Sequence, residues 1–382
     1  MKNNFNFQNP TKLIFGKGTI AQLAQNLPKN EKILVTYGSG SVKQNGVYAQ
    51  VCQVLKDFDY VEFWGIEPNP TVETLRKAIA LGKQEKITYI LAVGGGSVID
   101  GTKLISSAIP YHGDAWELVL NPSKIGKMIP FASVLTLPAT GSEMNCGAVI
   151  SNAEKKEKYA FYSSFPQFSI LDPTVTFSLP DFQIACGIAD TFIHVLEQYL
   201  TVPNESPLMD RWSEGIMQTL IELAPVIKAD KTNYNAMAEF MICATMALNG
   251  FTAMGVTEDW ATHLIGHEIT ALHGTTHGQT LVIVLLGLMQ VMREQKKAKL
   301  LQFGARVFNI TEGTETQRID QTIDACEQFF RAIGLVTKLH ELNIDTETIL
   351  KIKERFLSRN TQLGECRNID GNVTEEILTK CL

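Results

Sequence analysis

Hydrophobic positions in the first half of the chain predict short strands that alternate with helices. Apolar, β-branched runs over 32–37, 89–93 and 133–137 are typical of buried strands, and the stretch 72–84 has the pattern of an amphipathic helix. The strands show little polar alternation, which is expected when both faces of a parallel sheet are covered. We therefore predict a doubly wound, mainly parallel α/β sheet.

The hydrophobic pattern changes near residue 178. Ser178, Pro180 and Asp181 together have the form of a helix start: a hydroxyl at the cap, a proline in the first turn and an acidic residue three positions after the cap. A long helix is therefore expected to begin at this point.

Beyond this point strand patterns nearly vanish, and apolar positions recur with the helical period of 3.6 residues. Helices are expected over 207–223, 234–248 and 314–333. A chain of 382 residues also exceeds the usual size of one hydrophobic core. We predict two domains: an α/β domain over 1–178 and an all-α domain over 179–382.

Composition narrows the class of protein. Hydrophobic residues make up 45% and charged residues 19% of the chain, which is ordinary for a globular protein. The formal charge of -6 and the lack of a basic stretch argue against nucleic acid as a partner. The sequence has no run that resembles a signal peptide or a membrane span, so we expect a cytoplasmic protein with no membrane partner. The seven cysteines form no CxxC pair, so a thiolate zinc site is not indicated.

Glycines cluster after two predicted strands. The first cluster is Gly38-Ser39-Gly40-Ser41, which has the start of a dinucleotide fingerprint but Lys43 where its third glycine would stand. A plain turn explains this cluster about as well as a nucleotide site does.

The second cluster, Gly94 to Gly96 followed by Ser97, opens a helix directly after the strand 89–93. Glycines let backbone amides approach a phosphate at a helix N-terminus. A tight turn needs one or two glycines, and a third adds unfolded-state entropy with no evident packing gain, so this cluster favours phosphate binding. The hydroxyls of Thr136 and Thr140 lie at and after the end of another predicted strand, although hydroxyl-rich turns are common without a ligand.

Histidines give the clearest chemical signal. Four of the seven lie within fifteen residues: His263, His267, His273 and His277. A lone histidine on an apolar face is usually a core residue, but this density favours a metal site rich in imidazole.

A carboxylate accompanies this cluster. Asp190 and His194 are four residues apart in the expected long helix, so they share one helical face. Alone they would be read as a surface pair. Spacing does not decide which histidine stays outside the ligand set. Imidazoles with one carboxylate suit Fe(II) or Zn(II), whereas Mg(II) and Ca(II) prefer more oxygens.

At these residues the sequence resembles the iron-activated alcohol dehydrogenases, in particular their NADPH-dependent butanol dehydrogenase and aldehyde reductase branch. The resemblance runs nearly end to end. Its motifs are 94–100, 136–143, 171–173, 190–197 and 259–280. It implies a dehydroquinate synthase-like architecture: a dinucleotide-binding α/β domain, a helical domain, a cleft between them, and usually a homodimer. The chain lacks a proline that the family pattern has after Thr280.

The resemblance also implies residue roles. Its metal ligands are Asp190, His194, His263 and His277. It places pyrophosphate at Gly95, Gly96 and Ser97, nicotinamide near Asp100, Thr136 and Thr140, and ribose near Asn69 and Lys158. It places His267 beside the metal, where it would handle protons or contact the substrate. Asp100 is the second catalytic residue that we predict, and His273 has no role.

These roles predict a reaction. The metal polarises an aldehyde oxygen while the nicotinamide delivers hydride, which gives a primary alcohol, and the reverse reaction oxidises alcohols. No Asp or Glu occurs between Thr36 and Gly46, where NAD-selective folds commonly hold the ribose hydroxyls, so we expect NADP(H) to be preferred over NAD(H). The amides and hydroxyls of Gly38, Ser39, Gly40 and Ser41 can donate to the oxygens of a 2'-phosphate, and Lys43 either adds a counter-charge or simply faces solvent.

Three other functions compete with this one. A dehydroquinate synthase or a glycerol phosphate dehydrogenase needs basic residues near the metal, and 260–277 contains no Lys or Arg. A metallohydrolase would use a metal-bound hydroxide, and its glycine loops would be turns that bind no cofactor. A non-catalytic NADPH-binding protein would have no need of four metal ligands.

Overall fold

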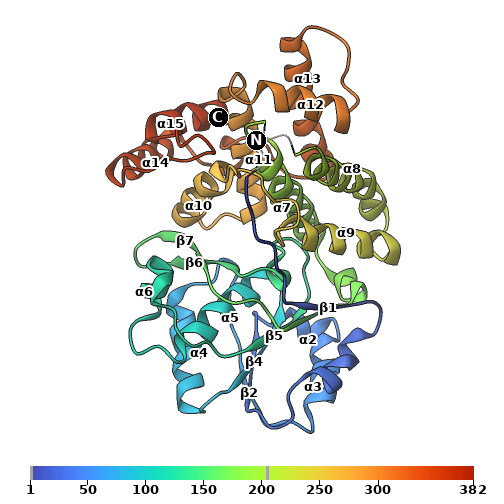
Figure 1. The fold of residues 1–382 in the computed structure, drawn as a ribbon, viewed down its shortest axis with the longest axis vertical. Helices are drawn as coiled ribbons and strands as arrows, with labels where there is room; N and C mark the ends of the chain where they lie inside the picture. Colours follow the sequence, from blue (N-terminus) through green and yellow to red (C-terminus); the bar gives the residue numbers. More distant parts are fainter. Residues whose placement is uncertain (1–2, 204–205) are drawn as a thin grey trace. The chain divides into compact units, whose positions relative to one another are not determined.

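The computed structural model describes residues 3–203 and 206–382, which form two compact units (Figure 1). The sheet unit consists of residues 8–180 and 230–249. The helical unit consists of 181–229, 250–382 and the N-terminal residues up to Phe7. These units differ at two places from a division at residue 178, because 230–249 joins the sheet and the N-terminus joins the helices.

The sheet unit is built on six parallel strands, as the hydrophobic pattern predicted. Their spatial order is β1 (Lys12–Phe15), β8 (Phe168–Leu171), β5 (Phe131–Leu135), β4 (Tyr89–Gly94), β2 (Ile33–Tyr37) and β3 (Tyr60–Phe63). All residues of β2, β4, β5 and β8 are buried, which is why these strands read as continuous apolar runs. A separate antiparallel hairpin pairs β6 (Gly147–Asn152) with β7 (Glu157–Tyr162).

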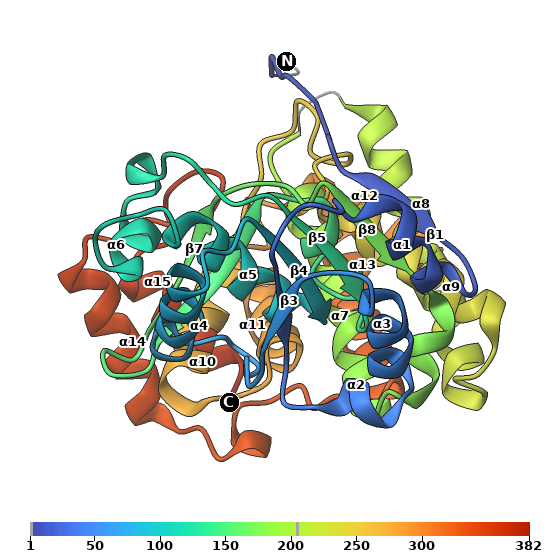
Figure 2. The ribbon, with the colours of Figure 1, turned by 90° about the horizontal axis from the view of Figure 1, so that it is seen from below.

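Helices cover both faces of this sheet (Figure 2). One face carries α4 (Val72–Gln84), α5 (Gly96–Ala108) and α6 (Ala115–Leu120); the other carries α1 (Leu23–Asn26), α2 (Ser41–Gln44) and α3 (Val47–Leu55). Each face has its own hydrophobic core. The doubly wound sheet is therefore confirmed, and helix α4 has the predicted bounds.

Helix α9 (Tyr234–Ala247) belongs to the sheet unit although it lies among helices in the sequence. Met241 is part of the core that also contains helices α4 and α5. The hydroxyl of Thr245 donates to the buried carboxyl of Glu143 over 2.5 Å. Helical periodicity alone does not say which core a helix will join.

The helical unit contains the remaining long helices. They are α7 (Asp181–Tyr199), α8 (Pro207–Ala229), α10 (Ala261–His273), α11 (His277–Val291), α12 (Lys297–Val307), α13 (Glu315–Ala332), α14 (Thr346–Ser358) and α15 (Gly371–Lys380). Within the described ranges no strand follows Leu171, so the predicted all-α second half is confirmed. No described helix is both long and apolar enough to cross a membrane.

Two local expectations need comment. The long helix expected near residue 178 is confirmed as α7, which begins at Asp181, but the capping role of Ser178 was wrong: Ser178 ends a 3-10 helix (η4, Pro173–Ser178) and its hydroxyl donates to the Val175 carbonyl. The missing proline after Thr280 leaves α11 continuous from His277 to Val291. An uninterrupted helix is expected where no proline removes a backbone donor.

Candidate metal centre and nucleotide site

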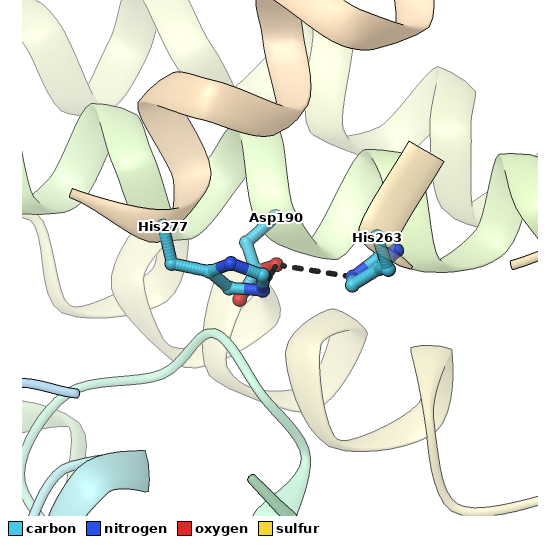
Figure 3. Close-up of side chains that lie close together, drawn as sticks. All are labelled: Asp190, His263 and His277. Atoms are coloured by element: carbon cyan, nitrogen blue, oxygen red, sulfur yellow. Dashed lines mark ion pairs between the residues drawn. The ribbon is translucent and has the colours of Figure 1, made fainter. Parts of the chain in front are cut away.

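The four predicted metal ligands lie around one carboxylate oxygen. The Oδ1 atom of Asp190 is 3.7 Å from Nε2 of His194, 3.7 Å from Nε2 of His263 and 3.6 Å from Nε2 of His277. Figure 3 shows Asp190 between His263 and His277, which come from three different helices. Ligand atoms of Asp190, His263 and His277 all lie within 4.8 Å of one another.

Local sequence explains this convergence. Helix α10 ends at Gly274, which adopts the left-handed conformation with φ 67°, and α11 begins three residues later with His277. Helix α11 approaches helix α7 closely, since a Cβ atom on Gly278 would lie 2.5 Å from the carbonyl oxygen of Cys186. Only glycine permits this approach. As a result, His277 lies next to Asp190, one turn further along α7.

The geometry fits a divalent ion. Nitrogen and oxygen ligands bind Zn(II) at about 2.0–2.2 Å, so two ligands of a tetrahedral ion are roughly 3.4 Å apart. The observed separations of 3.6–3.7 Å are close to that value. Three imidazoles with one carboxylate are also a donor set that suits Zn(II) and Fe(II).

Glu197 is a residue near this centre that the sequence analysis did not single out. Its carboxylate is hydrogen-bonded to Nδ1 of His263 and accepts from the backbone N–H of Thr262 over 2.6 Å. Burial lowers the pKa of His263, but the neighbouring carboxylates of Glu197 and Asp190 outweigh burial and raise that pKa to about 9. A usable signal was present, because Glu197 follows Asp190 by seven residues and so shares its helical face.

The other two clustered histidines differ. The buried ring of His267 lies 5.4 Å from the ring of His277 and 6.4 Å from that of His263, measured between centroids. His273 instead points to helix α14, where its Nε2 atom is 2.9 Å from the hydroxyl of Thr348. His267 therefore neighbours the predicted ligands, whereas His273 joins two helices.

In the sheet unit, the predicted phosphate residues lie at the start of helix α5. Gly95 is its N-cap, and Gly96 and Ser97 begin its first turn. A Cβ atom on Gly96 would lie 2.3 Å from the hydroxyl oxygen of Thr140, so the structure brings these two predicted cofactor residues into contact. A Cβ atom on Gly94 would lie 2.4 Å from the side chain of Val98.

These contacts correct one step of the sequence argument. The prediction that the third glycine brings no packing gain was wrong, because close neighbours require glycine at both Gly94 and Gly96. The helix N-terminus remains a suitable place for a phosphate, because its first-turn amides and dipole favour an anion. The glycines themselves no longer discriminate between packing and binding.

Asp100 is fully engaged with its own unit. Its carboxylate accepts from the hydroxyl of Ser142 over 2.5 Å and from the backbone N–H of Val149 over 2.9 Å. The buried ammonium of Lys103 donates to Ser142, to Asn145 and to a backbone carbonyl. Burial raises the pKa of Asp100 and lowers that of Lys103 to about 8. This network fixes helix α5 against the hydroxyl-rich loop after β5.

Thr136 follows β5 at the same edge of the sheet, because β5 and β4 are parallel neighbours. The predicted ribose contacts also meet: Nζ of Lys158 donates to Oδ1 of Asn69 over 2.8 Å. Asn69 has φ 55°, a left-handed conformation that asparagine tolerates better than most residues.

The loop Gly38 to Ser41 lies at the carboxyl end of β2, and both its serines are exposed. Lys43 places its ammonium 4.0 Å from the ring centroid of Trp64. The nearby carboxylate of Glu62 accepts from Nε1 of Trp64 over 3.0 Å. One oxygen of the carboxylate in β3 is therefore engaged by the indole of Trp64.

Comparison with known protein families gives two matches that together span most of the chain. Residues 10–173 match the family described as iron-containing alcohol dehydrogenase. Residues 184–382 match the C-terminal domain of the Fe-containing alcohol dehydrogenase family.

Individual relatives agree with these matches. The chain is 47% identical to the NADPH-dependent aldehyde reductase YqhD of Escherichia coli over 98% of both chains. It is 38% identical to the probable NADH-dependent butanol dehydrogenase 1 of Bacillus subtilis, over 99% of this chain and 100% of that one. The crystal structure of E. coli YqhD superposes with a TM-score of 0.98, covering 100% of this chain and 99% of that chain. The NADH-dependent butanol dehydrogenase A of Thermotoga maritima gives a TM-score of 0.95 at 34% identity, covering 100% of this chain and 99% of that chain.

Proposed function

The chain belongs to the iron-containing alcohol dehydrogenase family, and from this premise we propose that it reduces aldehydes to primary alcohols with NADPH as the preferred hydride donor. It is an oxidoreductase of the alcohol dehydrogenase and aldehyde reductase type. The observation that carries the proposed site is the single carboxylate oxygen of Asp190 with three imidazole nitrogens at 3.6–3.7 Å.

In this proposal Asp190, His194, His263 and His277 hold one divalent ion, Fe(II) or Zn(II). When bound, the ion acts as a Lewis acid on a carbonyl oxygen and the nicotinamide supplies a hydride. The chain's own residues orient these partners. Helix α5 offers first-turn amides at Gly96 and Ser97 to the cofactor's phosphates.

His267 has the place for proton handling. His267 is 4% exposed and its ring packs beside the rings of His263 and His277, so it can pass a proton to the alkoxide oxygen that hydride transfer leaves on the product. For Asp100 we propose a positioning role beside the catalytic one that the resemblance implies. Since both carboxylate oxygens accept hydrogen bonds, we propose that it positions the loop that carries Thr140.

The preference for NADPH rests on the loop after β2. No carboxylate lies on this loop to accept the ribose hydroxyls, and the hydroxyls of Ser39 and Ser41 can donate to a 2'-phosphate. Glu62 lies on β3 and not on this loop, and its Oε2 atom accepts from Nε1 of Trp64. We also propose a homodimer, which light scattering on the purified protein tests.

One experiment tests the proposal directly. NADPH oxidation is measured across a panel of linear and branched aldehydes, and iron and zinc are quantified on the same sample. Turnover that rises with the bound metal supports the proposal. Metal-dependent hydrolysis of ester or phosphate substrates without NADPH oxidation would favour the metallohydrolase instead.

A further inference from the structure

We propose that Glu197 is a positioning residue that holds His263 in the tautomer able to bind the metal ion. This inference rests on the proposed function, because it assigns a role toward the same metal centre. It concerns the buried carboxylate behind the ligand and not the ligand itself.

Glu197 lies near the end of helix α7 and is only 3% exposed. Its two oxygens have separate partners: Oε1 accepts from the backbone N–H of Thr262 over 2.6 Å, and Oε2 is hydrogen-bonded to Nδ1 of His263. One side chain thus contacts both the backbone and a side chain of the first turn of α10.

The start of α10 explains why a carboxylate is needed there. Trp260 occupies the N-cap position with φ 63°, and its side chain makes no capping hydrogen bond. Two carboxylates replace it: Asp259 accepts from the N–H of Ala261 over 2.8 Å, and Glu197 accepts from that of Thr262. Negative charge at a helix N-terminus is favoured by the helix dipole.

The hydrogen bond to His263 sets which ring nitrogen carries the proton. An ionised carboxylate can only accept, so Nδ1 of His263 must donate. In the neutral imidazole the lone pair is then on Nε2, which lies 3.7 Å from Oδ1 of Asp190, on the side where the ion would bind. A carboxylate behind a ligating imidazole fixes its orientation and raises its basicity.

Further contacts hold Glu197 and the start of α10 together. The backbone N–H of Asp259 donates to the carbonyl of Glu197 over 3.0 Å. The buried ammonium of Lys296 then binds Asp259 at 2.5 Å, Glu365 at 2.9 Å and the carbonyl of Leu200 at 2.7 Å. The end of α7 and the start of α10 are therefore joined by charge-assisted hydrogen bonds.

The variant Glu197→Gln separates the tautomer role from a merely structural one. A glutamine can keep both hydrogen bonds, by accepting from Thr262 with its oxygen and donating to Nδ1 of His263 with its amide. That arrangement moves the imidazole proton to Nε2 and blocks the metal. If Glu197 served only to cap helix α10, this variant would bind metal as the wild type does.

The measurement is the affinity of the full-length, metal-depleted protein for Co(II) and Zn(II), by competition with a chelator, together with the visible absorption spectrum of the Co(II) form. We expect Glu197→Gln to bind each ion about 10- to 100-fold more weakly, with an altered Co(II) spectrum, while the metal-free variant keeps a Tm close to that of metal-free wild type.

A matched control exists on helix α10, which carries His263. Glu268 is a buried carboxylate of α10 that pairs with Arg355 at 3.0 Å and Arg359 at 2.6 Å. Glu268→Gln should lower the Tm and leave Co(II) affinity within about two-fold of wild type, because its pairing partners lie on α14 and at its C-cap and its loss moves no imidazole proton.

A double variant completes the test. If Glu197 acts through His263, then adding Glu197→Gln to His263→Ala should weaken Co(II) binding no further. Tight Co(II) binding by Glu197→Gln, or losses that simply add in the double variant, would overturn the inference while leaving the metal centre intact. Wild-type protein that fails to bind Co(II) and Zn(II) would overturn the proposed function as well.

Discussion

The proposed metal centre depends on side chains, whereas the proposed nucleotide site depends on backbone groups. In the helical unit, function is assigned to four side chains with metal-binding chemistry, and a sequence displays those residue types openly. In the sheet unit, the predicted phosphate site is the N-terminus of helix α5 at Gly95 and Gly96, where backbone amides would bind the phosphate. The contrast teaches that side-chain chemistry can be predicted from the sequence. A glycine can be required by packing or by ligand binding, and the sequence alone does not distinguish the two.

The largest effect should come from removing a metal ligand. His263→Ala and His277→Ala should each lose most bound metal and lower kcat/KM by about 1000-fold or more, because a Lewis acid supplies several kcal/mol to the transition state. Metal analysis and NADPH oxidation on one sample measure both. Full occupancy in both variants would contradict the assignment.

His273→Ala is the control for these ligand variants. This residue contacts Thr348 instead of the centre, so its loss should cost about 1 kcal/mol of unfolding free energy through one hydrogen bond. Metal content and kcat should stay near wild type.

A smaller effect is expected from His267→Ala. We expect kcat to fall about 100-fold through the loss of proton handling, with the metal retained. Steady-state kinetics and metal content decide between the two roles. If this variant loses metal as His263→Ala does, then His267 belongs to the ligand set and the comparison between ligand and neighbour fails.

The nucleotide site should respond to a change that removes no functional group. Gly96→Ala places a methyl group 2.3 Å from Thr140 and must displace that side chain or the start of α5. We expect NADPH to bind roughly 10-fold more weakly, since misplaced donors cost one charge-assisted hydrogen bond of about 1.5 kcal/mol. Fluorescence titration with NADPH measures this, and metal content should not change.

Gly215→Ala offers a matched glycine control, because no atom lies within 4 Å of the added Cβ in helix α8. It should be neutral or stabilise the protein by up to about 1 kcal/mol. Weakened NADPH binding in this variant would mean that the titration reports general stability and not the site.

The smallest effect concerns the choice of cofactor. We expect kcat/KM to favour NADPH over NADH by about 10-fold, which corresponds to about 1.4 kcal/mol at the 2'-phosphate. Ser39→Asp places a carboxylate on the exposed loop after β2 and should abolish that preference by repelling the phosphate. Equal values for the wild type would refute the interpretation of this loop.

Much of the fold could be predicted from the sequence because strands and helices differ in the spacing of their hydrophobic residues. The residues 72–84 form α4 with those bounds, and the strand at 89–93 appears as β4 with one added residue. Membership of α9 in the sheet unit could not be predicted, since Met241 looks like any apolar helix residue until its neighbours are known.

The sites divide in the same way. Residue type and helical spacing singled out Asp190 and the histidines, and the structure brings Asp190, His194, His263 and His277 together while His273 lies apart. Glu197 was missed because an acidic residue in a helix is usually solvated, and only its burial and its contact with His263 set it apart. The chemical role of Asp100 stays a prediction, and its hydrogen bonds with Ser142 and Val149 could not be predicted from spacing.

The return of residues 230–249 to the sheet unit has a consequence for synthesis. Translation proceeds from the N-terminus, so all six strands emerge before α9 does. Until α9 has been synthesised, the core beside α4 and α5 lacks the side chain of Met241, and the carboxyl of Glu143 lacks its hydrogen bond from Thr245. The nascent sheet must therefore wait while two helices of the other unit, α7 and α8, leave the ribosome. A gene cut at residue 180 would yield a sheet fragment without its closing helix, so the two units cannot be exchanged between relatives as simple N-terminal and C-terminal cassettes.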